Sequence, residues 1–384
     1  MKILNIADPS LFYDHDDISG SSISLHLSIK KPSKQKGMYE EGGQILRMSV
    51  AFSAIMNKPV KISKIRLGRS KPGLAAQHLT GLQMVAKMCG AKLTGAHIGS
   101  TEIRFVPGVI TGGQYQADTK TAGSISLLLQ VALPFALLAD KSVILDLRGG
   151  TNADMAPQIE YMTEVFRPVL KKFGGSFDLD LRRRGYYPKG GGCVIVNIKP
   201  VKQFDSVNLT NIGKVNKVIG WSFVSGTIPL KLTTVASNSA KQELRTICDH
   251  INIECYKEQQ EIAPYNCNGI VLVCQTSTGC TIGGSALGSR IVGPTEIGEK
   301  AAREIISTVQ HGACLDQFAQ DQVILYMALA RGSSSFSVGE ISLHTQTAIY
   351  IAQKFTQVSY YLCKVVMQRI LLYFKPTIQR IQLN

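Results

Sequence analysis

The chain has 384 residues, 45% of them hydrophobic and 18% charged, which predicts two or three compact units and excludes general disorder. Forty-two basic residues outnumber 27 acidic ones, and the formal net charge of +15 favours polyanionic partners such as nucleic acid or nucleotides. Nine scattered cysteines contain no Cys-x-x-Cys pair, so they exclude the common zinc modules and indicate reduced thiols in the cytosol or nucleus.

The N-terminal part of the chain differs in texture from the rest. Residues 1–39 pass from an acidic to a Ser-rich and then a Lys-rich sequence without a sustained period, so we expect a poorly ordered extension. From residue 40 onward, apolar periodicity predicts alternating helices and short strands. The first of these are a helix over 45–56, a strand over 60–67 and a helix over 77–88 that ends at Gly90.

The most apolar run of the sequence lies at 124–139. It is too short to span a membrane and contains Gln130 and Pro134, so it is interpreted as a buried helix of a soluble protein. Helices that return to short strands indicate an α+β fold. The further predicted elements are strands at 103–106, 143–147, 194–198, 217–224 and 270–275, and helices at 155–173 and 240–253.

Two features indicate repeated units and an insertion. The apolar, helix-like sequence at 130–139 resembles the one at 322–330, and both begin with a glutamine. This similarity suggests repeated βα units. The texture changes again between about 208 and 299, where strand-like runs flank a helix. We interpret this segment as a small α/β domain inserted in the larger body.

Two basic or glycine-rich segments are candidate anion sites. Gly42 and Gly43 precede a helix, where backbone amides and the helix dipole can meet a phosphate. Segment 58–71 carries six basic residues and no acidic one, which suits capture of a terminal phosphate but equally suits a solvated basic edge strand.

The string at 182–192 joins three arginines, two tyrosines and four glycines, three of them consecutive. It combines charge with stacking surface, as in single-stranded RNA sites, although a glycine-rich hairpin with packed tyrosines explains it equally well. His344 stands alone, and its surroundings do not by themselves indicate catalysis. The remaining histidines share no metal-ligand spacing.

Taken together, these strings resemble the RNA 3′-terminal phosphate cyclases. The matching motifs occur in the family's order over roughly four fifths of the chain, and in combination they are highly specific. They are found at 40–47, 66–73, 77–82, 99–102, 117–124, 149–158, 184–192, 276–280, 320–322 and 344–348.

The resemblance implies a body of repeated βαβαββ units, similar to the C-terminal domain of translation initiation factor three, with an inserted α/β domain. It implies that His344 attacks the α-phosphorus of ATP, that AMP passes to an RNA 3′-phosphate, and that the 2′-hydroxyl then closes a 2′,3′-cyclic phosphate. Imidazole is nucleophilic near neutral pH and leaves phosphorus readily, which suits such a relay. The implied cofactors are ATP and Mg²⁺ (or Mn²⁺), with no protein-held metal cluster.

Site residues follow by matching positions. Asp321 and Gln322 match the family's nucleotide-contacting pair. The implied ATP contacts also include Gln130, Pro157, Phe318 and Glu40, and the implied phosphate contacts are Arg47, Arg66, Arg69 and Gln77. The implied body then covers 40–207 and 300–354, with the nucleophile in the second part, and a divergent tail covers 355–384.

The chain departs from the family pattern at several positions. At its ends, residues 36–38 replace an expected strand, and after about Lys354 the closing strands are expected to be absent, with a helical tail as the alternative. Losing edge strands would expose backbone and apolar surface. Single-residue departures are Glu41, Ala75, Ala76, Phe318 and Cys193.

Two other functions stay open at this point. One is a non-catalytic ribosome-biogenesis factor of the same fold, against which the presence of His344 and Asp321 argues. The other is an RNA-binding remnant in which Glu41 and the altered ends have abolished turnover. For the cyclase itself, the expected partner is RNA with a 3′-terminal phosphate, the expected compartment is the nucleus, with the cytoplasm as alternative, and no membrane is involved.

Overall fold

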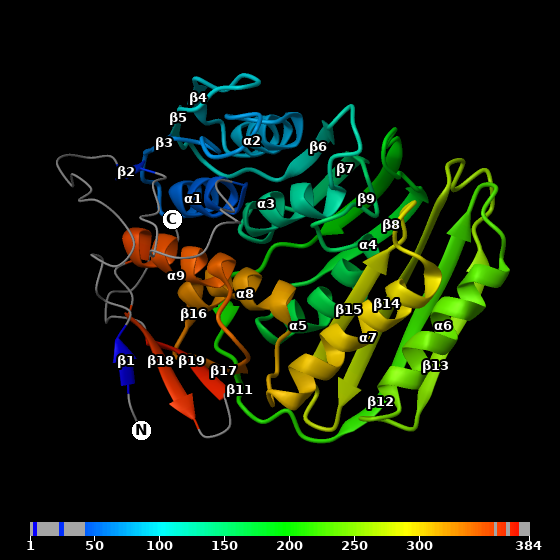
Figure 1. Cartoon of the computed structure of the whole chain (residues 1–384). Coiled ribbons are helices and arrows are strands. Elements are labelled where there is room, and N and C mark those ends of the chain that lie inside the picture. The colour runs from blue at the N-terminus through cyan, green and yellow to red at the C-terminus, as the bar shows by residue number, and fades with distance from the viewer. Residues whose placement is uncertain (1–2, 6–22, 27–42, 357–358, 366–368, 376–384) are drawn as a thin grey trace.

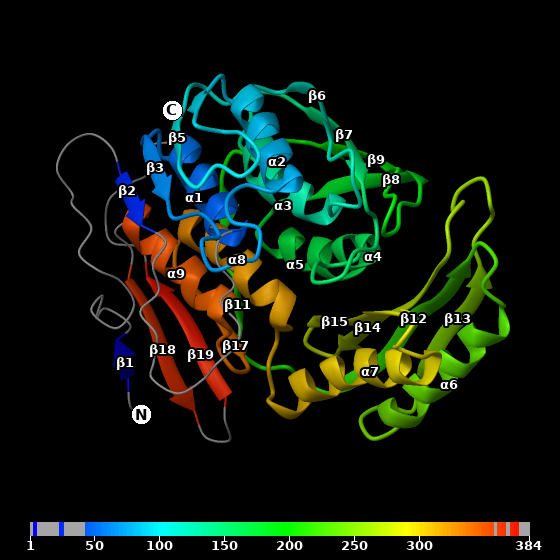
Figure 2. The ribbon, with the colours of Figure 1, turned by 45° about the horizontal axis from the view of Figure 1, so that its top comes forward.

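The computed structural model describes residues 3–5, 23–26, 43–356, 359–365 and 369–375, and it has the predicted α+β fold. Three sheets and their helices form a main body, and a fourth sheet with two helices projects from one side (Figures 1 and 2). Each of the three body sheets is built in the same order of strands and helices, so the body is a threefold repeat.

The first unit is a βαβαββ arrangement. Its strand order is β2-β3-β5-β4, with β2 parallel to β3 and the other pairs antiparallel. Its elements are β2 (Ile23–His26), α1 (Gly43–Ile55), β3 (Val60–Ser63), α2 (Ala76–Met88), β4 (Lys92–Thr94) and β5 (Ile103–Val106).

The second unit repeats this topology, with the strand order β6-β7-β9-β8 and one parallel pair. A π-helical turn, η2, divides its second helix into parts. The elements are β6 (Gly113–Asp118), α3 (Ile125–Leu137), β7 (Val143–Gly149), α4 (Ile159–Tyr161), η2 (Met162–Phe166), α5 (Arg167–Lys172), β8 (Phe177–Arg183) and β9 (Gly192–Ile198).

The third unit has the same strand order, β11-β17-β19-β18, as the first two. Strand β1 (Ile3–Asn5) pairs with the outer edge of β18. A short parallel pair of β10 (Phe204–Asp205) and β16 (Ala330–Arg331) lies outside the sheet. The other elements are β11 (Asn208–Leu209), α8 (Gln317–Leu329), β17 (Ser334–Val338), α9 (Leu343–Thr356), β18 (Ser359–Val365) and β19 (Arg369–Lys375).

The inserted domain, which we define as residues 215–310, lies in the chain between β11 and α8. Its sheet order is β13-β12-β14-β15, and α6 and α7 pack against each other beside this sheet (Figure 1). Helix α7 runs past the predicted boundary at 299. The elements are β12 (Val215–Ser225), α6 (Lys231–Leu244), β13 (Ile251–Lys257), β14 (Cys267–Thr276), β15 (Thr281–Leu287) and α7 (Pro294–Gln310).

The body core forms where helices of different units meet. Helix α1 contacts α2, α3 and α9, and α9 also contacts α8. Helix α3 begins at the N-cap Ser124, whose hydroxyl accepts the Leu127 N–H, and it buries nearly all of its side chains, as predicted for 124–139. Burial of each Leu, Val or Phe side chain stabilises the fold by about 1.5–3 kcal/mol relative to exposure. The contacts among these helices therefore hold their first turns in fixed positions. None of the described helices is both long and apolar enough to cross a membrane.

The expectation for the C-terminal tail is wrong. Instead of lacking the closing strands or forming a helix, the described residues of 355–384 complete α9 and form β18 and β19 of the third sheet. Tyr360 and Phe374 are buried there with ring centroids 5.1 Å apart, and the Tyr360 hydroxyl donates to the Ile324 carbonyl of α8. The tail is therefore part of the third unit and packs on one of its helices.

Two further expectations need correction or completion. The helix predicted over 240–253 spans Lys231–Leu244, and Ile251 already begins β13, which pairs in parallel with β12. Within the expected extension 1–39, residues 3–5 and 23–26 are strands, while its other residues, including 36–38, lie outside the described residues.

Candidate active site

A hydrogen-bonded relay joins His344 to Asp321 through Gln44. His344 is the second residue of α9, and its Nδ1 contacts Oε1 of Gln44 at the start of α1. The Gln44 amide nitrogen donates to Asp321 Oδ2 on α8 over 2.7 Å. Three helices from the first and third units thus bring these side chains together, because α9 packs on both α1 and α8.

The relay sets the tautomer of the imidazole. The Gln44 amide nitrogen faces the carboxylate, so the Gln44 amide oxygen faces His344. This oxygen can only accept a hydrogen bond, and Nδ1 of His344 must therefore be the protonated donor. Nε2 of the neutral ring then carries the lone pair. This is the arrangement that a nucleophilic histidine needs, since the attacking nitrogen must be unprotonated.

The carboxyl group of Asp321 has an unusual proton affinity. Burial raises its pKa to about 7, and the positive charge of Arg47 acts in the opposite direction. A carboxyl group whose pKa is perturbed by burial and by a specific charged neighbour, at the edge of a cavity, is a functional-site candidate. Arg47 therefore belongs to the electrostatics of this site as well as to its walls.

An open cavity of about 430 Å³ lies beside the relay. Like small-molecule sites, it has a mostly apolar lining with a few polar groups. Gln44, Asp321 and Gln322 line it at one side, and Gln130 joins them from α3. The remaining lining residues are Arg47, Met48, Ala51, Pro134, Phe166, Leu325 and Tyr326.

Gln322, which lines this cavity, has a buried acceptor without a partner among the described residues. Its amide nitrogen donates to the Phe318 carbonyl over 2.6 Å, while its buried Oε1 finds no hydrogen-bond partner in the described part of the chain. A buried acceptor without a donor costs about 1–3 kcal/mol.

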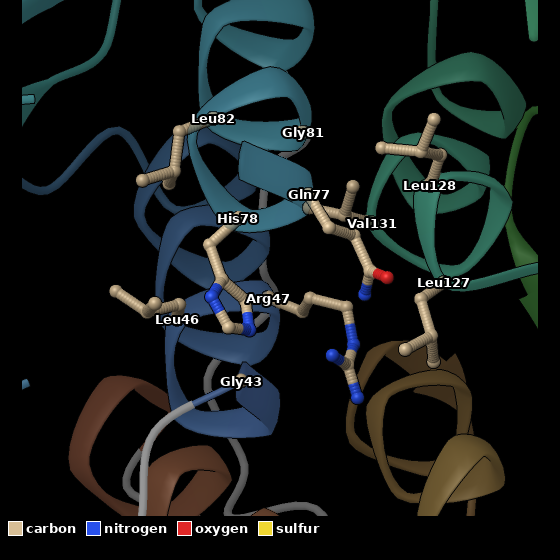
Figure 3. A pocket seen from close by; sticks show the side chains of 10 residues that line it. All are labelled: Gly43, Leu46, Arg47, Gln77, His78, Gly81, Leu82, Leu127, Leu128 and Val131. Carbon is tan, nitrogen blue, oxygen red and sulfur yellow. The ribbon is translucent and has the colours of Figure 1, made fainter. Parts of the chain in front are cut away.

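A second cavity of about 280 Å³, also lined by Arg47, lies between α1, α2 and α3 (Figure 3). Gln77, His78 and Arg47 form its polar wall, and the rest is apolar. The Gln77 side-chain oxygen accepts the Ser124 N–H over 2.7 Å, which fixes Gln77 between α2 and the start of α3. The other lining residues are Gly43, Leu46, Gly81, Leu82, Leu127, Leu128 and Val131.

His78 is uncharged at neutral pH. Burial and the nearby charges of Arg47 and Arg66 lower its pKa to about 4. Its Nδ1 accepts the Ala75 N–H over 3.3 Å, so the proton resides on Nε2, which can donate to a ligand. His78 thus adds a neutral donor to a wall that carries the charge of Arg47.

Several predicted site residues lie outside the two cavity linings. Arg66 and Arg69 occupy the turn after β3, where Arg66 donates to the Gly73 carbonyl over 2.9 Å. Burial, together with the nearby charge of Arg69, lowers the pKa of Arg66. Pro157 is buried, and Phe318 is half-buried with its ring edge-on to another ring. Glu40, like Glu41, lies outside the described residues.

The sequence reasoning did not assign roles to Gln44 and His78. Both lie in motifs that carry the family resemblance. Gln44 is part of a glycine-rich helix start, and His78 follows Gln77. Polar side chains in the first turn of an otherwise apolar helix were the signal that could have found them, since Gln44 is followed by an almost fully buried helix.

Comparison with known proteins identifies the family. The family model described as "RNA 3'-terminal phosphate cyclase" matches residues 38–362. A protein named RNA 3'-terminal phosphate cyclase from Drosophila melanogaster is 36% identical over 337 residues, covering 87% of this chain and 93% of its own length. One of the same name from Pyrobaculum neutrophilum is 38% identical over 325 residues, covering 84% and 93%. The chain therefore belongs to the RNA 3′-terminal phosphate cyclase family.

Proposed function

We propose that this chain uses ATP to convert an RNA 3′-terminal phosphate into a 2′,3′-cyclic phosphodiester through a covalent histidine–AMP intermediate on His344. The observation that carries the proposal is the relay from His344 through Gln44 to Asp321, at the edge of a cavity that suits a nucleotide. The names and coverage of the relatives support the reaction class.

In the first step Nε2 of His344 attacks the α-phosphorus of ATP. A P–N bond forms, the bond from the α-phosphorus to the bridging oxygen breaks, and pyrophosphate leaves. Gln44 holds the Nδ1 proton, so that the developing positive charge on the ring is stabilised through the amide by Asp321. The apolar wall of the larger cavity suits the adenine, and Gln322 is among its polar lining residues.

In the second step an oxygen of the RNA 3′-phosphate attacks the phosphorus of the adenylate, and the imidazole leaves. In the third, the neighbouring 2′-hydroxyl attacks the activated RNA phosphate, its proton passes to solvent, and AMP departs. The second cavity is suited to the RNA end, because Arg47 and neutral His78 present donors there. Since Arg47 lines both cavities, it can contact the adenylate and the RNA phosphate in turn.

Mg²⁺, when bound, would neutralise charge on the pyrophosphate leaving group. The described residues contain no group of three or more His, Cys, Asp or Glu side chains that could hold a metal ion. The ion would be carried mainly by the phosphates of the nucleotide, as Mg²⁺ usually is. Glu40, which lies outside the described residues, matches the family's carboxylate, and we propose that it assists metal or nucleotide binding.

The test is to incubate the protein with α-labelled ATP and isolate it under alkaline denaturing conditions, which preserve a P–N bond. We expect label on the wild-type chain and none on His344→Ala, with His250→Ala, a histidine of the inserted domain, as the matched control. Adding an RNA 3′-phosphate should discharge the label and yield a cyclic end. A folded wild-type chain that binds RNA but takes up no label would contradict the proposal and favour a non-catalytic RNA-binding role.

A further inference from the structure

The inserted domain is joined to the start of α8 at the edge of its sheet. Strand β15 is at the end of the strand order and pairs only with β14 among the described strands. Its second edge has two backbone N–H groups bonded to carboxylates. Gly283 donates to Asp316 Oδ2 over 2.8 Å, and Ser285 donates to Glu304 Oε2 over 3.0 Å.

Asp316 is also the N-cap of α8. Its other oxygen, Oδ1, accepts the N–H groups of Phe318 and Ala319 over 3.0 and 2.9 Å. The same oxygen accepts the hydroxyl of Tyr161 from the second unit over 2.5 Å. One carboxylate with 2% exposure therefore links the inserted domain, the second unit and the nucleotide-lining helix of the third unit.

The site residues on α8 follow Asp316 closely. Asp321 and Gln322, which line the larger cavity, are only five and six residues further on, about one and a half helical turns. A shift of the helix start therefore moves them directly. The junction is also tightly packed, since a Cβ added at Gly283 would come within 2.5 Å of the Tyr161 ring.

We propose that Asp316 is a positioning residue through which the inserted domain fixes α8 for nucleotide binding. The inference rests on the proposed function, because it concerns the same ATP site. It assigns the inserted domain a role in the adenylylation step. Asp316 touches neither cavity lining, so it acts through the placement of Asp321 and Gln322.

The two oxygens of Asp316 allow the helix cap and the domain link to be separated. In Asp316→Ser the single hydroxyl can still cap α8, since serine is as good an N-cap as aspartate, but it has no second oxygen for Gly283. In Asp316→Asn the shape is kept, yet an amide N–H faces the Gly283 N–H when the oxygen stays on the cap. Ser239→Ala is the matched control, because it removes a hydrogen bond to the Thr295 carbonyl inside the inserted domain, away from the link.

The experiment measures the rate of self-labelling by α-labelled ATP against ATP concentration. For both Asp316 variants we expect the ATP concentration at half-maximal rate to rise about tenfold, as expected when one hydrogen bond to a buried charged group is lost. Transfer of AMP from prelabelled protein to RNA should stay within about twofold of wild type, because that step does not require ATP to bind. Ser239→Ala should behave as wild type in both assays.

Equal ATP dependence of wild type and Asp316→Asn would overturn the inference, as would an equal loss in the AMP-transfer step. If Asp316→Ser fails to fold, the Asn variant alone decides the result. A wild-type chain without label would instead contradict the proposed function. A labelled wild type with unaffected variants would contradict only the role of Asp316.

Discussion

The relay makes a specific prediction for Gln44→Met. Methionine has a similar length and remains apolar enough for a site that is 6% exposed, but it can neither donate to Asp321 nor accept from His344. The substitution therefore removes two hydrogen bonds and leaves the helix packing largely intact. It should release the imidazole from its fixed tautomer and leave the Asp321 carboxylate without its amide donor.

The magnitude follows from those two bonds. Leaving a buried polar group without a partner costs about 1–3 kcal/mol, and a change of 1.4 kcal/mol in the barrier is tenfold in rate. If the whole of this free energy is lost from the stabilisation of the transition state, self-adenylylation at saturating ATP should slow by about 5- to 150-fold. The effect should appear in the maximal rate, since Gln44 stabilises the ring that reacts.

The assay is single-turnover labelling with α-labelled ATP, with thermal unfolding measured beside it. Gln116→Met is the matched control, because Gln116 also donates an amide hydrogen to a carboxylate, Asp146, over 2.9 Å, but does so on the exposed face of β6. Wild-type labelling by a well-folded Gln44→Met protein would refute the argument that this amide sets the tautomer of His344.

Three further predictions concern stability and pH. Because the pKa of Asp321 is raised to about 7, the folded state retains a proton that the unfolded state loses near pH 4. The free energy of unfolding should therefore fall as pH rises from about 4 to 7. Asp321→Asn should reduce that fall, as measured by urea titrations at each pH. Phe374→Ala should lower the free energy of unfolding by about 3–5 kcal/mol, since the ring is buried against Tyr360, and an unchanged urea midpoint would show that β19 does not pack as described. Gly185→Ala should cost about 1–3 kcal/mol or more, because its Cβ would lie 2.1 Å from the Gly149 carbonyl oxygen, and a thermal melt equal to wild type would contradict that close approach.

The helices of the first two units could be predicted from the sequence because their signals are local. Apolar periodicity and helix-ending glycine predicted α2, and the long apolar run predicted α3 almost to its bounds. Strands β18 and β19 were missed because their apolar residues also fit one face of a helix. What decides between the two is pairing with β17 and packing on α8, neither of which is visible in a local window.

The candidate site was partly predictable for the same reason. Ordered motifs identified His344, Asp321 and Gln322, but not the residue that joins them. Gln44 lies 277 residues from Asp321 and 300 from His344, and its role depends on three helices meeting in the core. The family resemblance could point to single residues as candidates. The hydrogen-bonded relay and the position of Arg47 in two cavity linings could be seen only in the folded structure.

The threefold repeat of the body has a consequence for how chemistry arises in this family. The second helices of the units are α2, α4 and α9, and the second residue of each is Gln77, Glu160 and His344, respectively. Gln77 accepts the Ser124 N–H and also lines the second cavity, whereas Glu160 pairs with Arg184, so each of these two positions makes a bond that holds the scaffold. Under the proposed function, triplication lets one copy of a position acquire a reactive group while bonds made by its two counterparts hold the scaffold around it.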